Sequence, residues 1–187
     1  LFRSSFYLKS ERGDIVDLHI QSIETTQNNY NKYTLMLYEP ITIGMEYQVV
    51  HQHARGVVLE YSAIVKTERF DEMFYYDGKD LGYTYTQDQT SFALWAPTAS
   101  RVKLEICKNG CIYTYEMRRS DKGVYRYTIL ENLENATYVY LVRVNGEWKE
   151  TIDPYGNASI QNAKRSAVVD LNKIRVKDYA LPKMNTA

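Results

Sequence analysis

Short runs in which apolar and polar residues alternate fill this chain, and no stretch shows a sustained helical period. Residues 101–106 show the alternation most sharply, with Val102, Leu104 and Ile106 facing one way. A period of two is that of a half-buried strand, because successive side chains of a strand point to opposite faces of its sheet. The pattern therefore predicts an all-β fold.

Turn signals separate these runs. Asn-Gly pairs at 109–110 and 145–146 favour two-residue hairpin turns, whose central residues need positive φ. Several short strands at such spacing are typical of β-sandwiches, and 187 residues suit two domains. We predict two tandem immunoglobulin-like β-sandwich domains at residues 1–77 and 78–172, followed at residues 173–187 by a linker to a further domain.

The charges of this chain balance, since Lys plus Arg and Asp plus Glu both number 23. A nucleic-acid binder needs a basic footprint that displaces counterions from phosphates, so we expect no nucleic-acid partner. No stretch approaches the about 20 apolar residues of a membrane-spanning helix, so we expect no membrane partner. The 18 tyrosines suit half-buried strands and also offer flat faces and hydroxyls to sugars.

Cysteine and histidine are sparse in the sequence. Cys107 and Cys111 flank the first Asn-Gly turn, and we expect two free thiols in a reducing compartment rather than a strained hairpin disulfide. His51 and His53 share one side of a strand without a third ligand placed by the sequence, whereas a structural zinc site needs four ligands. We expect no metal, no cofactor, and a bacterial cytoplasmic protein rather than a secreted one.

Four local sequences follow one another in an order that resembles type I pullulanases. They are Phe-Tyr-Tyr-Asp-Gly at 74–78, Phe-Ala-Leu-Trp-Ala-Pro-Thr-Ala at 92–99, Asp-Pro-Tyr at 153–155 and Arg-Ser-Ala-Val-Val-Asp-Leu at 165–171. The later three are similar to family 48 carbohydrate-binding modules, which precede the catalytic barrel in debranching and branching enzymes of the α-amylase superfamily. The first narrows the resemblance to the pullulanase branch. Residues 1–69 fit only by position, as the β-rich domain that such enzymes often carry ahead of the module.

The resemblance implies a parent protein that cleaves α-1,6 branch bonds in pullulan, starch or glycogen, with this chain as its non-catalytic accessory region. The family's catalytic acids and its Tyr-Asn-Trp-Gly-Tyr-Asp-Pro signature lie in the barrel, and no such motif occurs in this sequence. Retaining hydrolysis needs two carboxyl groups about 5 Å apart, on a barrel of about 250 residues. We assign no catalytic residue and expect no enzymatic activity from this chain alone.

Trp148 is the candidate carbohydrate-binding residue. It follows the second Asn-Gly turn, and Gly146-Glu147-Trp148 matches the Gly-x-Trp that stacks on glucose in glycogen-binding relatives. Those relatives carry a Lys on the preceding strand, where this sequence has Leu141, and their second tryptophan has no evident equivalent. Because of these departures, packing of Trp148 against a barrel or a loop is favoured over glucan contact.

The candidate barrel-docking residues are Trp95, Asp153, Pro154 and Tyr155. Trp95 stands at a strand end before Ala-Pro, where a partly buried packing role is the favoured alternative. The Asp-Pro-Tyr turn suits docking, and Asp153 also suits a cap of that turn. We expect an exposed apolar patch near Trp95 and Tyr155, since burial of apolar area against a barrel stabilises the pair.

Two other functions stay open for this sequence. One is a self-sufficient glucan-binding module, which binds maltoheptaose through Trp148 without help from a barrel. The other, less favoured, is a surface adhesion protein of immunoglobulin-like repeats, against which the lack of an internal repeat speaks. The expected partners are an α-glucan, bound weakly or indirectly, and the protein's own catalytic barrel.

Overall fold

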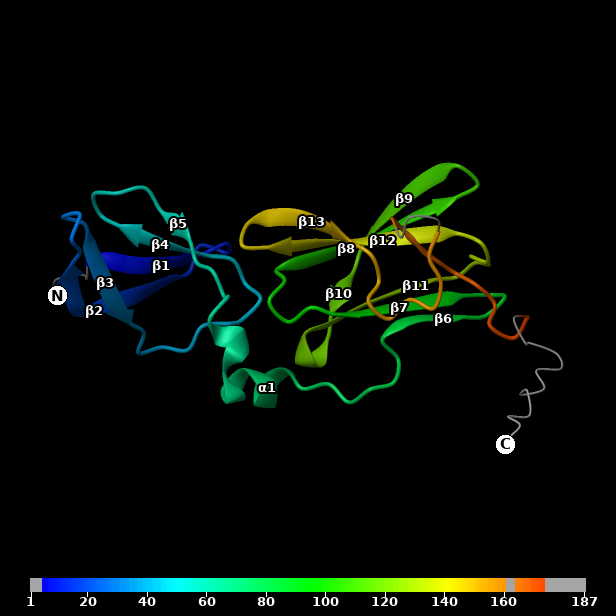
Figure 1. The fold of residues 1–187 in the computed structure, drawn as a ribbon, viewed down its shortest axis with the longest axis horizontal. Helices are drawn as coiled ribbons and strands as arrows, with labels where there is room; N and C mark the ends of the chain where they lie inside the picture. The colour runs from blue at the N-terminus through cyan, green and yellow to red at the C-terminus, as the bar shows by residue number, and fades with distance from the viewer. Residues whose placement is uncertain (1–4, 161–163, 174–187) are drawn as a thin grey trace, which may run out of the picture.

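The computed structural model describes residues 5–160 and 164–173, and Figure 1 shows their arrangement. The predicted linker at 173–187 lies outside the described residues except for Lys173. The elements are β1 (Phe6–Ser10), β2 (Ile15–Thr25), β3 (Asn31–Met36), β4 (Tyr47–His51), β5 (Val57–Val58), η1 (Ile64–Lys66), α1 (Glu68–Phe74), β6 (Gly82–Tyr85), β7 (Thr90–Trp95), β8 (Arg101–Lys108), β9 (Cys111–Glu116), β10 (Arg118–Arg119), η2 (Asp121–Gly123), β11 (Val124–Ile129), β12 (Thr137–Val144), β13 (Glu147–Thr151) and β14 (Ser166–Ala167).

The predicted all-β class is confirmed, because the strands form three antiparallel sheets joined across one short helix. The strands before α1 make one five-stranded sheet in the order β3-β2-β1-β4-β5, which we call the N-terminal sheet. After α1 come a four-stranded sheet, β10-β11-β7-β6, and the β12 sheet, β13-β12-β8-β9, in which β14 also pairs with β12. The division into two tandem sandwich domains with the predicted bounds stays a prediction.

The four-stranded sheet and the β12 sheet pack face to face around the main core. Phe92 of β7 meets Tyr138 of β12 with ring centroids 5.0 Å apart, and Tyr115 of β9 stacks on Tyr127 of β11 at 5.0 Å. The alternation at residues 101–106 is confirmed, since its three apolar side chains are at most 1% exposed. Aromatic and aliphatic side chains thus fill the space between the two sheets.

Strand β12 is central, because it pairs with β8, β13 and β14. Tyr138, Val139 and Tyr140 are each 0% exposed, so the first half of this strand is buried on both faces, while residues 141–144 are partly buried. The chain leaves it through Asn145 and Gly146 at φ 52° and 79°, which is the conformation of the type I′ hairpin turn that Asn-Gly favours. The strand after that turn, β13, is an edge strand and is exposed along its whole length.

The N-terminal sheet has a smaller core of its own. Leu8 of β1, Leu18 of β2 and Tyr47 of β4 are buried together with Tyr61 from the segment before α1. Strand β1 lies between β2 and β4, and the alternation of apolar residues in the sequence does not predict it. The core of this sheet therefore depends on a strand that sequence reasoning missed.

Helix α1 joins the two halves of the molecule, which lie on either side of it in Figure 1. The Thr67 hydroxyl caps its first turn by accepting a hydrogen bond from the Phe70 amide. Phe70 and Phe74 are buried together with Ile43 from the N-terminal half, and Trp95 from β7 packs against this cluster. The apolar side of the helix therefore packs against residues of both the N-terminal half and the sandwich.

Candidate functional site

Trp148 lies on the edge strand β13, and its side chain is 38% exposed. The Asn145-Gly146 turn that precedes it brings β13 back alongside β12, so Trp148 stands directly opposite Arg143. The structure thus places the indole near the surface, as the sequence predicts. An exposed indole on an edge strand is available to a ligand that approaches the sheet from solvent.

Three cations lie over the indole ring of Trp148. The Lys103 ammonium lies 4.8 Å from the ring centroid, and the guanidinium carbons of Arg101 and Arg143 lie 5.7 and 5.8 Å from it. All three are within the range at which a cation is attracted to the ring's quadrupole. Trp148 and the three cations, which we call the Trp148 cluster, come from strands β8, β12 and β13.

Carboxylates hold the two arginines of the Trp148 cluster. Arg101 makes a bidentate pair with Glu116, at 2.7 and 3.0 Å, and Arg143 makes one with Glu46, at 2.5 and 3.1 Å. The hydrogen bond from Arg143 holds the pKa of Glu46 below its usual range. Lys103, in the part of the chain that the structure describes, has no carboxylate partner, so its ammonium is the donor of the cluster that a ligand hydroxyl can use.

The sequence pattern does not predict that Lys103 lies next to Trp148. Where glycogen-binding relatives carry a lysine, this chain has Leu141 of β12, which the register pairs with Lys103 of β8. Lys103 reaches the indole of Trp148 from β8, which lies beyond β12 in the sheet order β13-β12-β8. No pattern within either strand reveals this neighbourhood, because it depends on how β8 and β12 are aligned.

A second candidate site is an apolar hollow of about 390 Å³ beside the end of β7. Its lining residues are Asp71, Tyr75, Tyr76, Leu81, Trp95 and Tyr155. Tyr155 is 44% exposed, while the half-buried Trp95 donates its indole N–H to the Phe74 carbonyl at 2.9 Å. Neither ring lies wholly inside the core, and the apolar surface expected near these two residues is present as this hollow.

Asp153 lies inside the fold, although the sequence named it as a docking candidate. It is 5% exposed, and its carboxylate accepts hydrogen bonds from the hydroxyls of Tyr138 and Tyr140, at 2.6 and 3.4 Å. It also accepts one from the Tyr155 amide at 2.8 Å, which caps the turn around the exposed Pro154. Burial raises the pKa of Asp153 above its usual value. Asp153 therefore anchors the Asp-Pro-Tyr turn from within and leaves Tyr155 on the surface.

The remaining sequence candidates stand apart from both sites. His51 and His53 lie edge to face, 5.7 Å apart, and among residues 5–160 and 164–173 no group of three His, Cys, Asp or Glu side chains is arranged to hold a metal. Cys107 and Cys111 are free thiols. No helix within the described ranges is long and apolar enough to cross a membrane. A cytoplasmic location stays a prediction.

Comparison with known proteins matches the part of the chain that holds the Trp148 cluster and part of the hollow. Residues 80–156 match the model of carbohydrate-binding module 48, also described as the isoamylase N-terminal domain. A pullulanase of Bacillus subtilis strain 168 is 34% identical over 139 residues, which are 74% of this chain and 19% of that protein. The matched region includes Trp148 and Lys103 as well as the hollow's Trp95 and Tyr155.

Solved structures extend the similarity to the N-terminal sheet. The pullulanase of Anoxybacillus sp. LM18-11, complexed with maltotriose, matches 94% of this chain with a TM-score of 0.86 and 32% identity. The type I pullulanase of Bacillus subtilis str. 168, complexed with maltose, matches 97% with a TM-score of 0.84 and 30% identity. The chain spans 25% of each of those two proteins, so it corresponds to about a quarter of their length.

Proposed function

We propose that this chain, which is the N-terminal region of a pullulanase-type protein and carries a family 48 carbohydrate-binding module, binds α-glucan through Trp148 and Lys103. The chain matches the carbohydrate-binding-module region of pullulanases and not their catalytic domain. Its contribution to the parent protein is therefore non-catalytic. It holds substrate and supports the catalytic barrel.

The observation that carries the proposal is the exposed indole with the Lys103 ammonium 4.8 Å from its centre. A sugar ring has an apolar face, which suits an indole, and a rim of hydroxyls, which suits a cationic donor beside it. Similar proteins that were solved with maltose or maltotriose support an α-glucan as the ligand class. Trp148 lies exposed on an edge strand, so we expect weak binding.

Calorimetric titration with maltoheptaose tests the proposal. We expect the 187-residue chain to bind with a Kd on the order of millimolar, and we expect Trp148→Ala to abolish the heat of binding. Tyr113→Ala is the matched control, because Tyr113 is an exposed aromatic residue on β9, the opposite edge of the same sheet. Binding that survives Trp148→Ala, or that is lost equally in both variants, contradicts the assignment of Trp148.

A second role follows from the apolar hollow around Trp95 and Tyr155. Its half-exposed aromatic lining suits docking against the barrel that the parent protein carries beyond this chain. Docking and glucan binding use different residues, so both roles fit in one chain. If the module binds glucan without the barrel, it is a self-sufficient binding module that also supports the barrel.

For the whole protein we propose cleavage of α-1,6-glucosidic branch bonds in pullulan, starch or glycogen. The similarity to pullulanases at 30–34% identity supports this activity. We expect the full-length protein to release reducing ends from pullulan and the 187-residue chain to release none. Hydrolysis by the purified chain alone, retained through repeated chromatography, would overturn the accessory role.

A further inference from the structure

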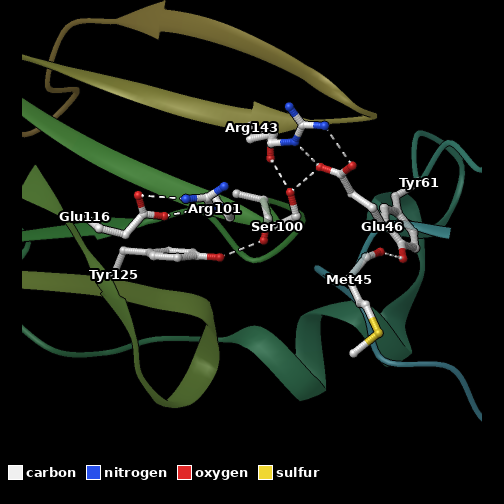
Figure 2. Close-up of polar contacts among 9 residues, drawn as sticks. Met45, Glu46, Tyr61, Ser100, Arg101, Glu116, Tyr125 and Arg143 are labelled. Carbon is white, nitrogen blue, oxygen red and sulfur yellow. Dashed lines mark hydrogen bonds and ion pairs between the residues drawn. The ribbon is translucent and has the colours of Figure 1, made fainter. Parts of the chain in front are cut away.

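Glu46 links the N-terminal sheet to the Trp148 cluster. It stands just before β4, and its carboxylate receives three hydrogen bonds from the sandwich. Arg143 donates two of them, from Nε at 2.5 Å and Nη2 at 3.1 Å, and the Ser100 hydroxyl donates the third at 2.6 Å. Figure 2 shows the carboxylate pointing from the N-terminal half into this set of donors.

Arg143 is shared between Glu46 and the indole. It stands opposite Trp148 across β12 and β13, with its guanidinium carbon 5.8 Å from the ring centroid. The arginine and the glutamate are only 29% and 19% exposed. A bidentate pair with a carboxylate fixes both the position and the plane of a guanidinium. The pair with Glu46 therefore holds the Arg143 guanidinium in one position relative to the Trp148 ring.

The segment that carries Glu46 is itself tightly fixed. Gly44 has φ +88°, and a Cβ there would lie 2.3 Å from Nη1 of Arg119 and 2.7 Å from the Pro97 carbonyl oxygen. Arg119 also donates to the Ile43 carbonyl at 3.1 Å. On the other side, the Tyr61 hydroxyl donates to the Met45 carbonyl at 2.5 Å, as Figure 2 shows. The backbone of residues 43–46 is therefore held from both halves of the molecule.

We propose that Glu46 is a positioning residue for the glucan site, through which the N-terminal sheet sets the geometry of the Trp148 cluster. This inference rests on the proposed function, because it assigns Glu46 a part in the same site. With Glu46 in place, the Arg143 guanidinium stays at a fixed place beside the indole. Without that carboxylate the guanidinium, which already lies over the ring at 5.8 Å, is free to move closer to it and competes more strongly with a sugar for the aromatic surface.

The chain offers a matched control for this pair. Glu105 and Arg165 form an ion pair at 2.8 Å, each 20% exposed, and Glu105 lies on β8 of the same sheet. Neither residue contacts the Trp148 ring or the N-terminal sheet through a described hydrogen bond or cation–π contact. Glu105→Gln therefore breaks a comparable ion pair away from the site.

The first test is the NMR spectrum of the indole N–H groups, of which the chain has two because it has two tryptophans. Trp148→Phe assigns the two resonances. In the unliganded 187-residue chain, we expect Glu46→Gln to shift the Trp148 resonance and Glu105→Gln to leave it in place. If Glu46→Gln leaves it unmoved, or both variants shift it equally, the positioning role is wrong.

The second test is maltoheptaose affinity, measured on the same variants. We expect Glu46→Gln to weaken binding about two- to tenfold, the effect of releasing one ordered side chain, while Glu105→Gln binds like the parent. Unchanged affinity with a shifted resonance overturns the inferred effect on binding. A parent chain that binds no glucan at all, with the resonance still shifted by Glu46→Gln, overturns the proposed function and leaves the coupling of Glu46 to Trp148 supported.

Discussion

At the scale of single residues, the site depends on neighbours that no stretch of sequence brings together. Trp148 was predicted at the surface because an Asn-Gly turn precedes it, and this local signal was sufficient. Lys103 and Glu46 were not predicted as its neighbours. They reach Trp148 and Arg143 through the β8–β12 register and through a contact between residues 97 positions apart, and alternation within a strand carries no information about either.

For Asp153, the sequence indicates the turn but not the burial of the side chain. Its turn with Pro154 and Tyr155 was recognised, but its burial under two tyrosine hydroxyls depends on where β12 lies. Because burial raises the pKa of Asp153, the folded state binds a proton more tightly than the unfolded state. The stability that this carboxyl contributes is therefore fully present below its ordinary pKa of about 4 and falls as the pH rises through the raised value.

Replacement of Asp153 by Asn removes this titration. We expect the free energy of unfolding of the parent, minus that of Asp153→Asn, to decrease as the pH rises from about 4 towards neutrality. Urea unfolding of both proteins at several pH values measures the difference. A difference that stays constant or grows with pH would show that the folded-state pKa of Asp153 is not raised.

At the scale of elements, hairpins were predictable and the first strand was not. The turns at 109–110 and 145–146 have positive φ at both residues, as Asn-Gly pairs favour. Strand β1 begins with Phe6, Tyr7 and Leu8, which put large side chains on both faces, so its alternation is weak. It also ends at the buried Ser10, whose hydroxyl donates a hydrogen bond to Asp14. A polar residue at a buried position breaks the apolar alternation by which a strand is predicted.

The β12–β13 hairpin provides a prediction for an element. Gly146 and Gly110 have φ of +79° and +80°, and neither position crowds an added Cβ. Nothing lies within 4 Å of a Cβ at position 110, and the nearest atom to one at position 146 is a methyl carbon of Val58 at 3.6 Å. Alanine at either position costs about 1–2 kcal/mol through its backbone conformation alone. We expect Gly146→Ala and Gly110→Ala to lower the free energy of unfolding similarly, as measured in urea.

Glucan binding separates the two glycine variants. Gly146 belongs to the turn that aligns Trp148 with Arg143, whereas Gly110 belongs to the turn between β8 and β9. We expect maltoheptaose affinity to fall in Gly146→Ala and to stay unchanged in Gly110→Ala. Equal affinities in the two variants would mean that the geometry of the β12–β13 turn is unimportant for the site.

At the scale of the whole molecule, the all-β class and the relationship to pullulanases followed from the sequence, while the contact between the two halves did not. Residues 43–46, α1 and the end of β7 meet through long-range packing around Phe70 and Trp95. Long-range contacts of this kind leave no local pattern. The similarity of 94–97% of the chain to solved pullulanases shows that both halves belong to this family architecture.

The proposed docking of a catalytic barrel against the hollow is testable in the whole protein. Tyr155 is 44% exposed in this chain, so we expect Tyr155→Ser to leave the Tm of the chain nearly unchanged and to lower the Tm of the full-length protein. Tyr113→Ser, at an exposed tyrosine away from the hollow, is the control. Equal Tm values for full-length Tyr155→Ser and the parent would show that the barrel does not dock on this surface.

The most direct measurement of glucan binding is a titration of the ¹⁵N-labelled 187-residue chain with maltoheptaose, followed on its two indole N–H resonances. The exposed Trp148 is expected to shift progressively and saturate at concentrations on the order of millimolar. Trp95, whose indole N–H is bound to the Phe74 carbonyl, is expected to stay in place. If Trp148 does not move at tens of millimolar ligand, or if Trp95 alone moves, the carbohydrate-binding role of this surface is contradicted.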